Sequence, residues 1–305
     1  MTDVLGELPL VGPGGEPVDL RRTILSHGVA DLPPMFVDED EPALELTLAV
    51  ANSRPRTVRL EPGSPGHVAV RGTGRRPGAH VVAQLLAGVR HVLRLDEDLS
   101  PFYASIAADD VLAWAAAGAG RLVRSTTVFE DVVKTICTTN CAWSATERMV
   151  GALVANLGST AAGAPREGAH GRTFPTPAAM ALADDDFYAE VARTGYRGRY
   201  LKQLANAVAT RALDLEALAD PELPDDEAER RLLALPGVGP YAAAHIQLIA
   251  LGRYRPLILD SWTRPKYARL IQKGSVNDAA ITRRFRRYGP WAGLAFWLFV
   301  TQDWV

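Results

Sequence analysis

Apolar and polar residues alternate along three short stretches near the N-terminus, at residues 44–48, 57–61 and 67–71. A period of two is typical of a strand that buries one face. Clusters of Pro, Gly and Ser separate the stretches, as tight turns require. The pattern predicts a meander-like antiparallel sheet, and the Gly-, Arg- and Pro-containing stretch 72–78 predicts a linker after it.

The pattern becomes helical at about residue 79. Apolar residues between 129 and 137 recur at the i, i+3, i+4, i+7 and i+8 positions of one helix face. A second helix is predicted from Trp143 towards Leu157, and the Gly-, Ala- and Pro-rich stretch 158–177 predicts a surface loop. Further helices are predicted over residues 177–183, 186–194, 200–211, 227–234, 241–251, 262–272 and 289–300.

These elements define an α+β fold class. We expect a small N-terminal antiparallel β-sheet domain with its linker over residues 1–78, and a larger all-α helical domain over residues 79–305. The chain has 305 residues, of which 48% are hydrophobic and 22% charged, so it can bury a sizeable core as a globular monomer.

Charge is distributed unevenly along the chain. The net charge is −2, but residues 252–305 hold ten Lys and Arg against three Asp, whereas residues 214–229 hold eight acidic residues and no basic one. A basic face on a nearly neutral protein fits local attraction to a polyanion such as DNA. The alternative is an ordinary solvated surface of mixed charge.

The two cysteines, Cys137 and Cys141, are four residues apart on a predicted helix, which is a poor arrangement for a disulfide. Two thiols are too few for an iron–sulfur cluster, and the six histidines show no zinc spacing, so we expect no metal and no cofactor. The sequence has neither a signal-peptide pattern nor an apolar run long enough to span a bilayer. We therefore expect a cytoplasmic protein without a membrane partner, associated with the nucleoid if the source is bacterial.

The stretch 235–241, Leu-Pro-Gly-Val-Gly-Pro-Tyr, lies between two predicted helices. Two glycines two positions apart allow a tight reversal that brings backbone N–H groups up to a phosphate oxygen. The second helix adds the positive end of its dipole. An ordinary helix–turn–helix joint would give the same local pattern.

A single carboxylate, Asp260, follows the apolar run 256–259 and precedes the helix predicted near Trp262. It can cap that helix, and the helix start stabilises its negative charge. An ionised carboxylate also stabilises the oxocarbenium-like sugar that forms as a glycosidic bond breaks. The two roles are compatible.

At these residues the sequence resembles the helix-hairpin-helix–Gly/Pro-Asp superfamily of base-excision DNA glycosylases, in its alkylpurine and 8-oxoguanine branch. The hairpin 235–243 with Asp260 is similar to the motif that names the superfamily. Residues 129–140, 195–200 and 288–295 resemble three further motifs of that branch, in the same order. The resemblance covers most of residues 80–305, and the β-rich N-terminal segment also fits the branch.

The resemblance implies a role for the residues of each motif. The turn residues Gly237, Val238 and Gly239 would contact a DNA phosphate through their backbone, and Asp260 would be the catalytic carboxylate.

Enzymes that act on a base must take it out of the helical stack, and something must fill the gap. The resemblance implies that Asn140 fills this gap, that Tyr196 wedges into the duplex, and that Arg197 reaches the base left without its partner. Each of these residues also has an ordinary structural explanation, as a helix-ending or half-buried side chain.

Relatives that also cut the DNA strand carry a lysine directly before the second helix of the hairpin, where its amine attacks the sugar. Here that position is Tyr241, and the four-cysteine cluster of some relatives is absent. The departure implies a monofunctional enzyme that uses water as the nucleophile. Aromatic residues that could stack on the excised base are Trp143, Tyr241, Trp262 and Trp291, with Phe296 and Trp297 as further candidates.

We therefore expect a DNA-3-methyladenine glycosylase II-like hydrolase that acts in base excision repair. Its partner would be double-stranded DNA that contains damaged purines, most favourably alkylated ones, because a cationic base leaves readily and stacks well on electron-rich rings. The alternatives are an oxidised-purine (8-oxoguanine-type) glycosylase, a non-catalytic DNA-structure-binding protein, and a metabolic enzyme that uses the hairpin only as a joint.

Overall fold

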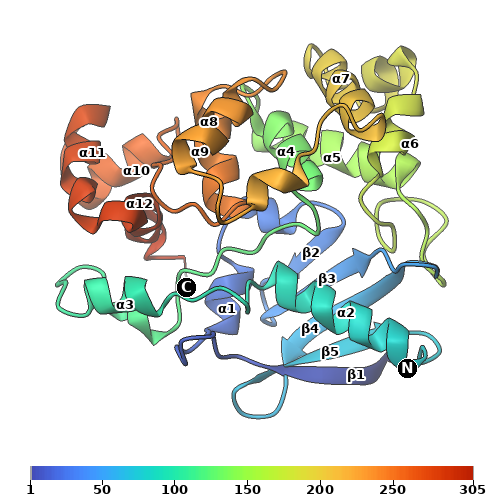
Figure 1. Ribbon diagram of the computed structural model, residues 1–305, viewed down its shortest axis with the longest axis horizontal. Helices are drawn as coiled ribbons and strands as arrows, with labels where there is room; N and C mark the ends of the chain where they lie inside the picture. Colours follow the sequence, from blue (N-terminus) through green and yellow to red (C-terminus); the bar gives the residue numbers. More distant parts are fainter. Residues whose placement is uncertain (1, 305) are drawn as a thin grey trace.

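The computed structural model describes residues 2–304 of the chain. Its N-terminal part is a five-stranded antiparallel sheet in the order β1-β5-β4-β3-β2. Figure 1 shows α2 lying against the sheet and helices α4–α12 grouped above it in this view, with α3 on the opposite side of α1 from the sheet. The strands are β1 (Thr2–Pro9), β2 (Met35–Asp38), β3 (Ala43–Leu48), β4 (Arg56–Pro62) and β5 (His67–Thr73).

The α+β class and the three strands expected from the alternating pattern are confirmed. Strands β1 and β2 are not evident from the sequence. In β1 the register shifts between Val4 and Gly6, so the buried Leu5 and Leu8 are three residues apart and the period of two is lost. Strand β2 is too short to show a period.

The helices are α1 (Leu20–Ile24), α2 (Ala79–Val92), α3 (Ser100–Ile106), α4 (Val128–Thr138), α5 (Trp143–Leu157), α6 (Pro177–Leu182), α7 (Arg197–Ala209), α8 (Asp225–Leu233), α9 (Pro240–Ile249), α10 (Thr263–Leu270), α11 (Asp278–Phe285) and α12 (Ala292–Thr301). Two expected helices need correction. The stretch 186–194 contains a single π-helical turn, Phe187–Val191. The last helix begins at Ala292 rather than at Gly289, because Gly289 has a φ of +57° and Pro290 follows it.

Three apolar clusters form the core. The first cluster joins the sheet to α1 and α2 and includes Leu85, Val89 and Val92 of α2. The residues that pack on the sheet therefore extend beyond residue 78. The expected domain boundary at residue 78 stays a prediction. The second joins α4–α9, and the third joins α3 with α9–α12. Helix α9 contributes to both helical clusters and lies between them (Figure 1).

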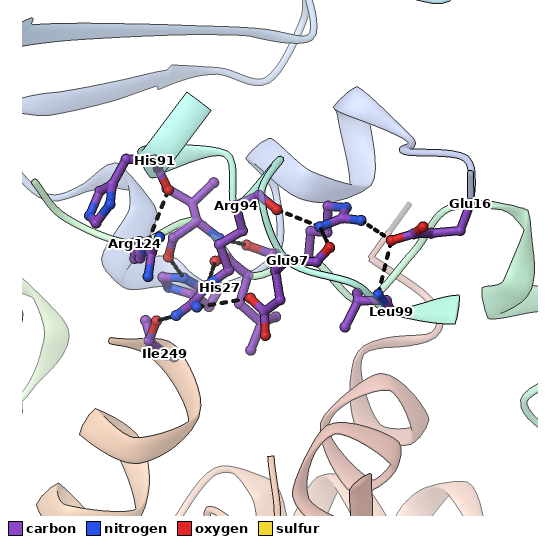
Figure 2. Close-up of polar contacts among 12 residues, drawn as sticks. Glu16, His27, His91, Arg94, Glu97, Leu99, Arg124 and Ile249 are labelled. Carbon is purple, nitrogen blue, oxygen red and sulfur yellow. Dashed lines mark hydrogen bonds and ion pairs between the residues drawn. The ribbon is translucent and has the colours of Figure 1, made fainter. Parts of the chain in front are cut away.

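A buried polar network ties the end of α9 to the segment after α2 (Figure 2). The guanidinium of Arg94, which is 1% exposed, donates to the backbone oxygens of Leu122 and Ile249 and to the carboxylate of Glu97. A cation at the C-terminal end of a helix is favourable, and a buried charge demands such partners. The network therefore fixes the end of α9, the second helix of the hairpin, against the segment that follows α2.

Candidate active site

The hairpin expected from the sequence is a turn between α8 and α9. Gly237 has a φ of +80°, and a Cβ atom on it would stand 2.9 Å from the ring of Tyr200. Gly239 precedes α9 in extended backbone, and a Cβ there would meet nothing within 4 Å. The turn thus packs against α7 at its first glycine and faces open space at its second.

The amides of this turn are not equivalent. The N–H of Val238 donates to the backbone oxygen of Leu235 at 3.2 Å, and the Val238 side chain is buried. The N–H groups of Gly237 and Gly239 donate to no residue that the structure describes. If the turn binds a phosphate, these two amides are the available donors, together with the positive end of α9.

The carboxylate of Asp260 lies at the start of α10 and is half-buried. Its Oδ1 accepts hydrogen bonds from the N–H groups of Trp262 at 2.8 Å and Thr263 at 2.6 Å, and the Asp260 N–H donates to Thr263 Oγ1 at 2.9 Å. Its Oδ2 accepts no hydrogen bond within residues 2–304. One oxygen is therefore fixed by the helix start, and the other is left for a ligand.

The charge of Asp260 acts on two side chains on successive turns of α9, Tyr241 and His245, whose ring centroids are 5.9 Å apart. Burial raises the pKa of Tyr241, and the charge of Asp260 adds to this rise. Burial lowers the pKa of His245 to about 4, and Asp260 opposes this change. At neutral pH both rings are therefore uncharged.

These two rings are held by α4. His245 Nδ1 lies 3.3 Å from Thr135 Oγ1, and the hydroxyl of Tyr241 lies 3.5 Å from Thr138 Oγ1. Sequence reasoning did not single out His245, although its spacing of four from Tyr241 places both on one face of α9. The threonines carry no signal in the sequence that would connect them to α9.

The aromatic candidates for a base pocket fall into three settings. Trp262 is 40% exposed, two residues after Asp260, and its ring packs against Trp297 at 5.9 Å and Trp304 at 5.4 Å. Trp143 is exposed at the start of α5 and lies against Gly28.

Trp291 instead packs in the core of the C-terminal helices, where its ring stacks on Tyr254 at 5.4 Å and contacts Phe102 at 5.5 Å. Phe296 is fully buried in the same core. Trp262 thus lies at the same helix start as Asp260, Tyr241 is affected by the charge of Asp260, and Trp291 and Phe296 have core contacts.

Two sequence motifs that are far apart in the chain meet at Asn140 and Tyr196. Asn140 has a φ of +50°, at the end of α4, and its Nδ2 donates to the hydroxyl of Tyr196 at 3.3 Å. Tyr196 is 49% exposed. Arg197 is buried, with its guanidinium 4.6 Å from the centre of the Tyr196 ring and a hydrogen bond to the backbone oxygen of Thr139. In this arrangement Arg197 joins the two motifs, and its contact with a base stays a prediction.

Comparison with solved structures identifies the fold. The structure is similar to a 3-methyladenine DNA glycosylase from Archaeoglobus fulgidus, with a TM-score of 0.70 and 20% identity over 97% of this chain and 98% of that one. It is also similar to an 8-oxoguanine glycosylase/lyase from Clostridium acetobutylicum, with a TM-score of 0.70 and 18% identity over 94% of this chain and 93% of that one.

The chain has a DNA glycosylase fold. The Clostridium acetobutylicum protein is also known in complex with double-stranded DNA that contains cytosine opposite 8-oxoguanine, and that structure matches with a TM-score of 0.70. Neither family models nor curated proteins match the sequence. No helix in residues 2–304 is long and apolar enough to cross a membrane.

Proposed function

We propose that this protein is a monofunctional DNA glycosylase that excises damaged purines, preferentially alkylated ones, from duplex DNA. The observation that carries the proposal is the geometry of Asp260. One oxygen is fixed by the start of α10, the other accepts no hydrogen bond within residues 2–304, and the charge of Asp260 acts on the uncharged Tyr241 and His245 of the helix that follows the glycine turn. The similarity of the whole chain to DNA glycosylases supports it at the level of the fold.

The proposed reaction is hydrolysis of the N-glycosidic bond. The base leaves with the bonding electrons, and positive charge develops on the deoxyribose. Asp260 stabilises this charge, and a water molecule then adds to C1′ and gives up a proton. The catalytic benefit comes from a charge that is in place before the cation forms.

Tyr241 supports hydrolysis by water rather than by an enzyme amine. Tyr241 has no amine with which to form a Schiff base with the sugar, and Lys134 is buried in an ion pair with Glu130 at 2.8 Å. We therefore propose that the product is an intact strand with an abasic site.

The uncharged rings also support the preference for alkylated bases. An alkylated purine carries a positive charge, which is compatible with neutral aromatic groups and an anion but not with a cationic lysine or histidine. Because burial lowers the pKa of His245 to about 4, this side chain adds no positive charge at neutral pH.

A panel of duplex oligonucleotides tests the proposal. The duplexes contain methylated purines, hypoxanthine, 8-oxoguanine or no lesion, and the products are separated on denaturing gels with and without alkali. We expect strand cleavage at alkylated purines only after alkali, and no borohydride-trapped adduct. Excision confined to 8-oxoguanine would favour the oxidised-purine alternative, and binding without excision of any base would favour a non-catalytic DNA-binding protein.

A further inference from the structure

Tyr200, in the first turn of α7, connects the proposed DNA-facing residues. Its ring lies against Gly237 of the hairpin turn, where an added Cβ would approach to 2.9 Å. The same ring packs edge-to-face against Tyr196, with the centroids 6.1 Å apart. The wedge residue and the glycine turn therefore share one aromatic support.

Arg199 lies on the exposed side of this support. Its guanidinium carbon is 4.7 Å from the centre of the Tyr200 ring, and Nη2 donates to the Tyr200 hydroxyl at 2.8 Å. The side chain is exposed, and within residues 2–304 it forms no ion pair. Arg230 and Arg231 of α8, by contrast, each have an acidic partner, because both pair with Glu227 at 2.6 Å.

A cation held in one orientation without a counter-charge is well suited to bind an anion. A guanidinium donates two parallel hydrogen bonds to a phosphate, and its restriction by an aromatic ring lowers the entropy lost on binding. Since Arg199 and Gly237 contact the same ring, a DNA strand that meets the glycine turn also passes the guanidinium.

We propose that Arg199 binds a phosphodiester of the DNA strand beside the one bound by the Gly237–Gly239 turn, and that Tyr200 is its positioning residue. This inference rests on the proposed function. It assigns a side-chain charge to the phosphate contacts of a surface whose other expected phosphate contacts are backbone amides.

The test compares Arg199→Gln with a matched control, Arg211→Gln. Arg211 is also exposed and forms no ion pair within the described residues, but it lies beyond the other end of α7, which is about 15 Å from Arg199 along the helix axis. Affinity for a duplex with an abasic-site analogue is measured by fluorescence anisotropy at several salt concentrations. Single-turnover excision is measured with saturating enzyme.

We expect Arg199→Gln to weaken binding about fivefold to tenfold and to reduce the slope of log affinity against log salt by about 0.9. The excision rate at saturation should remain that of the wild type, because the chemistry at Asp260 is untouched. Arg211→Gln should leave both affinity and slope unchanged. A wild-type slope in Arg199→Gln, or an equal reduction in Arg211→Gln, would overturn the proposal.

Two variants of Tyr200 test the positioning role. Tyr200→Phe keeps the ring beneath the guanidinium and should keep nearly the wild-type slope, whereas Tyr200→Leu should lose slope as Arg199→Gln does. A wild-type slope in Tyr200→Leu overturns the positioning role. If Tyr200→Leu does not fold, Tyr200→Met, which also lacks both the ring and the hydroxyl, takes its place, and a wild-type slope in that variant overturns the positioning role.

The outcome is separable from that of the proposed function. If the wild-type protein excises no base from the panel of duplexes, the proposed function fails. If the wild type excises bases and only the Arg199→Gln slope is unaltered, the proposed function stands and this inference fails.

Discussion

The substitution Asp260→Asn tests the proposed chemistry while it preserves the local structure. Asparagine is as good a helix N-cap as aspartate, and its Oδ1 can accept the same two hydrogen bonds from Trp262 and Thr263. The stability of the protein should therefore change by less than about 0.5 kcal/mol. The substitution therefore removes the negative charge and leaves the shape and the hydrogen bonds of the side chain at the helix start nearly unchanged.

The expected loss of activity follows from the charge on the sugar. A carboxylate about 4 Å from a unit positive charge contributes about 4 kcal/mol at an effective dielectric constant of about 20, which suits a half-buried group. Because the positive charge exists only in the transition state, this energy appears in the rate of excision, as a loss of about 10³-fold. Affinity for undamaged DNA should not fall, since an anion beside phosphates does not favour binding.

Single-turnover excision of an alkylated purine, read out by alkali cleavage, measures the rate, and anisotropy and thermal melting check binding and folding. The control is Asp278→Asn, which removes an exposed aspartate that pairs with Arg264 near the start of α11. The control should excise bases at the wild-type rate. Excision by folded Asp260→Asn within about threefold of the wild type would refute the reasoning.

The remaining predictions concern the turn and the buried histidines. Gly239→Ala should fold normally, because the added Cβ enters open space and the φ of Gly239 is −105°. The variant should bind DNA more weakly, because the backbone at this position must approach a phosphate. An unaltered DNA affinity, measured by anisotropy, would contradict this role. Gly237→Ala should lower stability by about 1–3 kcal/mol in thermal melts, since its φ of +80° is strained for alanine and its Cβ would press on Tyr200. Burial lowers the pKa of His27 to about 3 and that of His245 to about 4. Below about pH 6.5 the unfolded state therefore binds more protons than the folded state. The free energy of unfolding should consequently fall as the pH drops from 6.5 towards 4. His27→Gln should flatten this dependence by up to about 1.4 kcal/mol per pH unit in urea unfolding at pH 7 and pH 5, and a slope equal to that of the wild type would count against it.

The N-terminal stretches of the chain illustrate how far a periodic pattern reaches. Strands β3–β5 are predictable because apolar and polar residue types alternate along each of them, although several residues of the polar face, such as Thr47 and Thr57, are also buried in the fold. In β1 the irregular register between Val4 and Gly6 removes that signal, although the strand is among the best paired. A pattern reports burial on an ideal element, so it fails where the element is irregular.

The candidate site divides in the same way. The glycine turn and the placement of Asp260 before a helix are local features, set by residues within a few positions of one another, and the sequence alone determined them. Three pairings join residues distant in the chain: Asn140 with Tyr196, His245 with the charge of Asp260, and Tyr200 with Gly237. Only the tertiary structure decided these contacts, because they depend on how whole helices pack against one another, and the spacing of residues along one helix does not encode its neighbour.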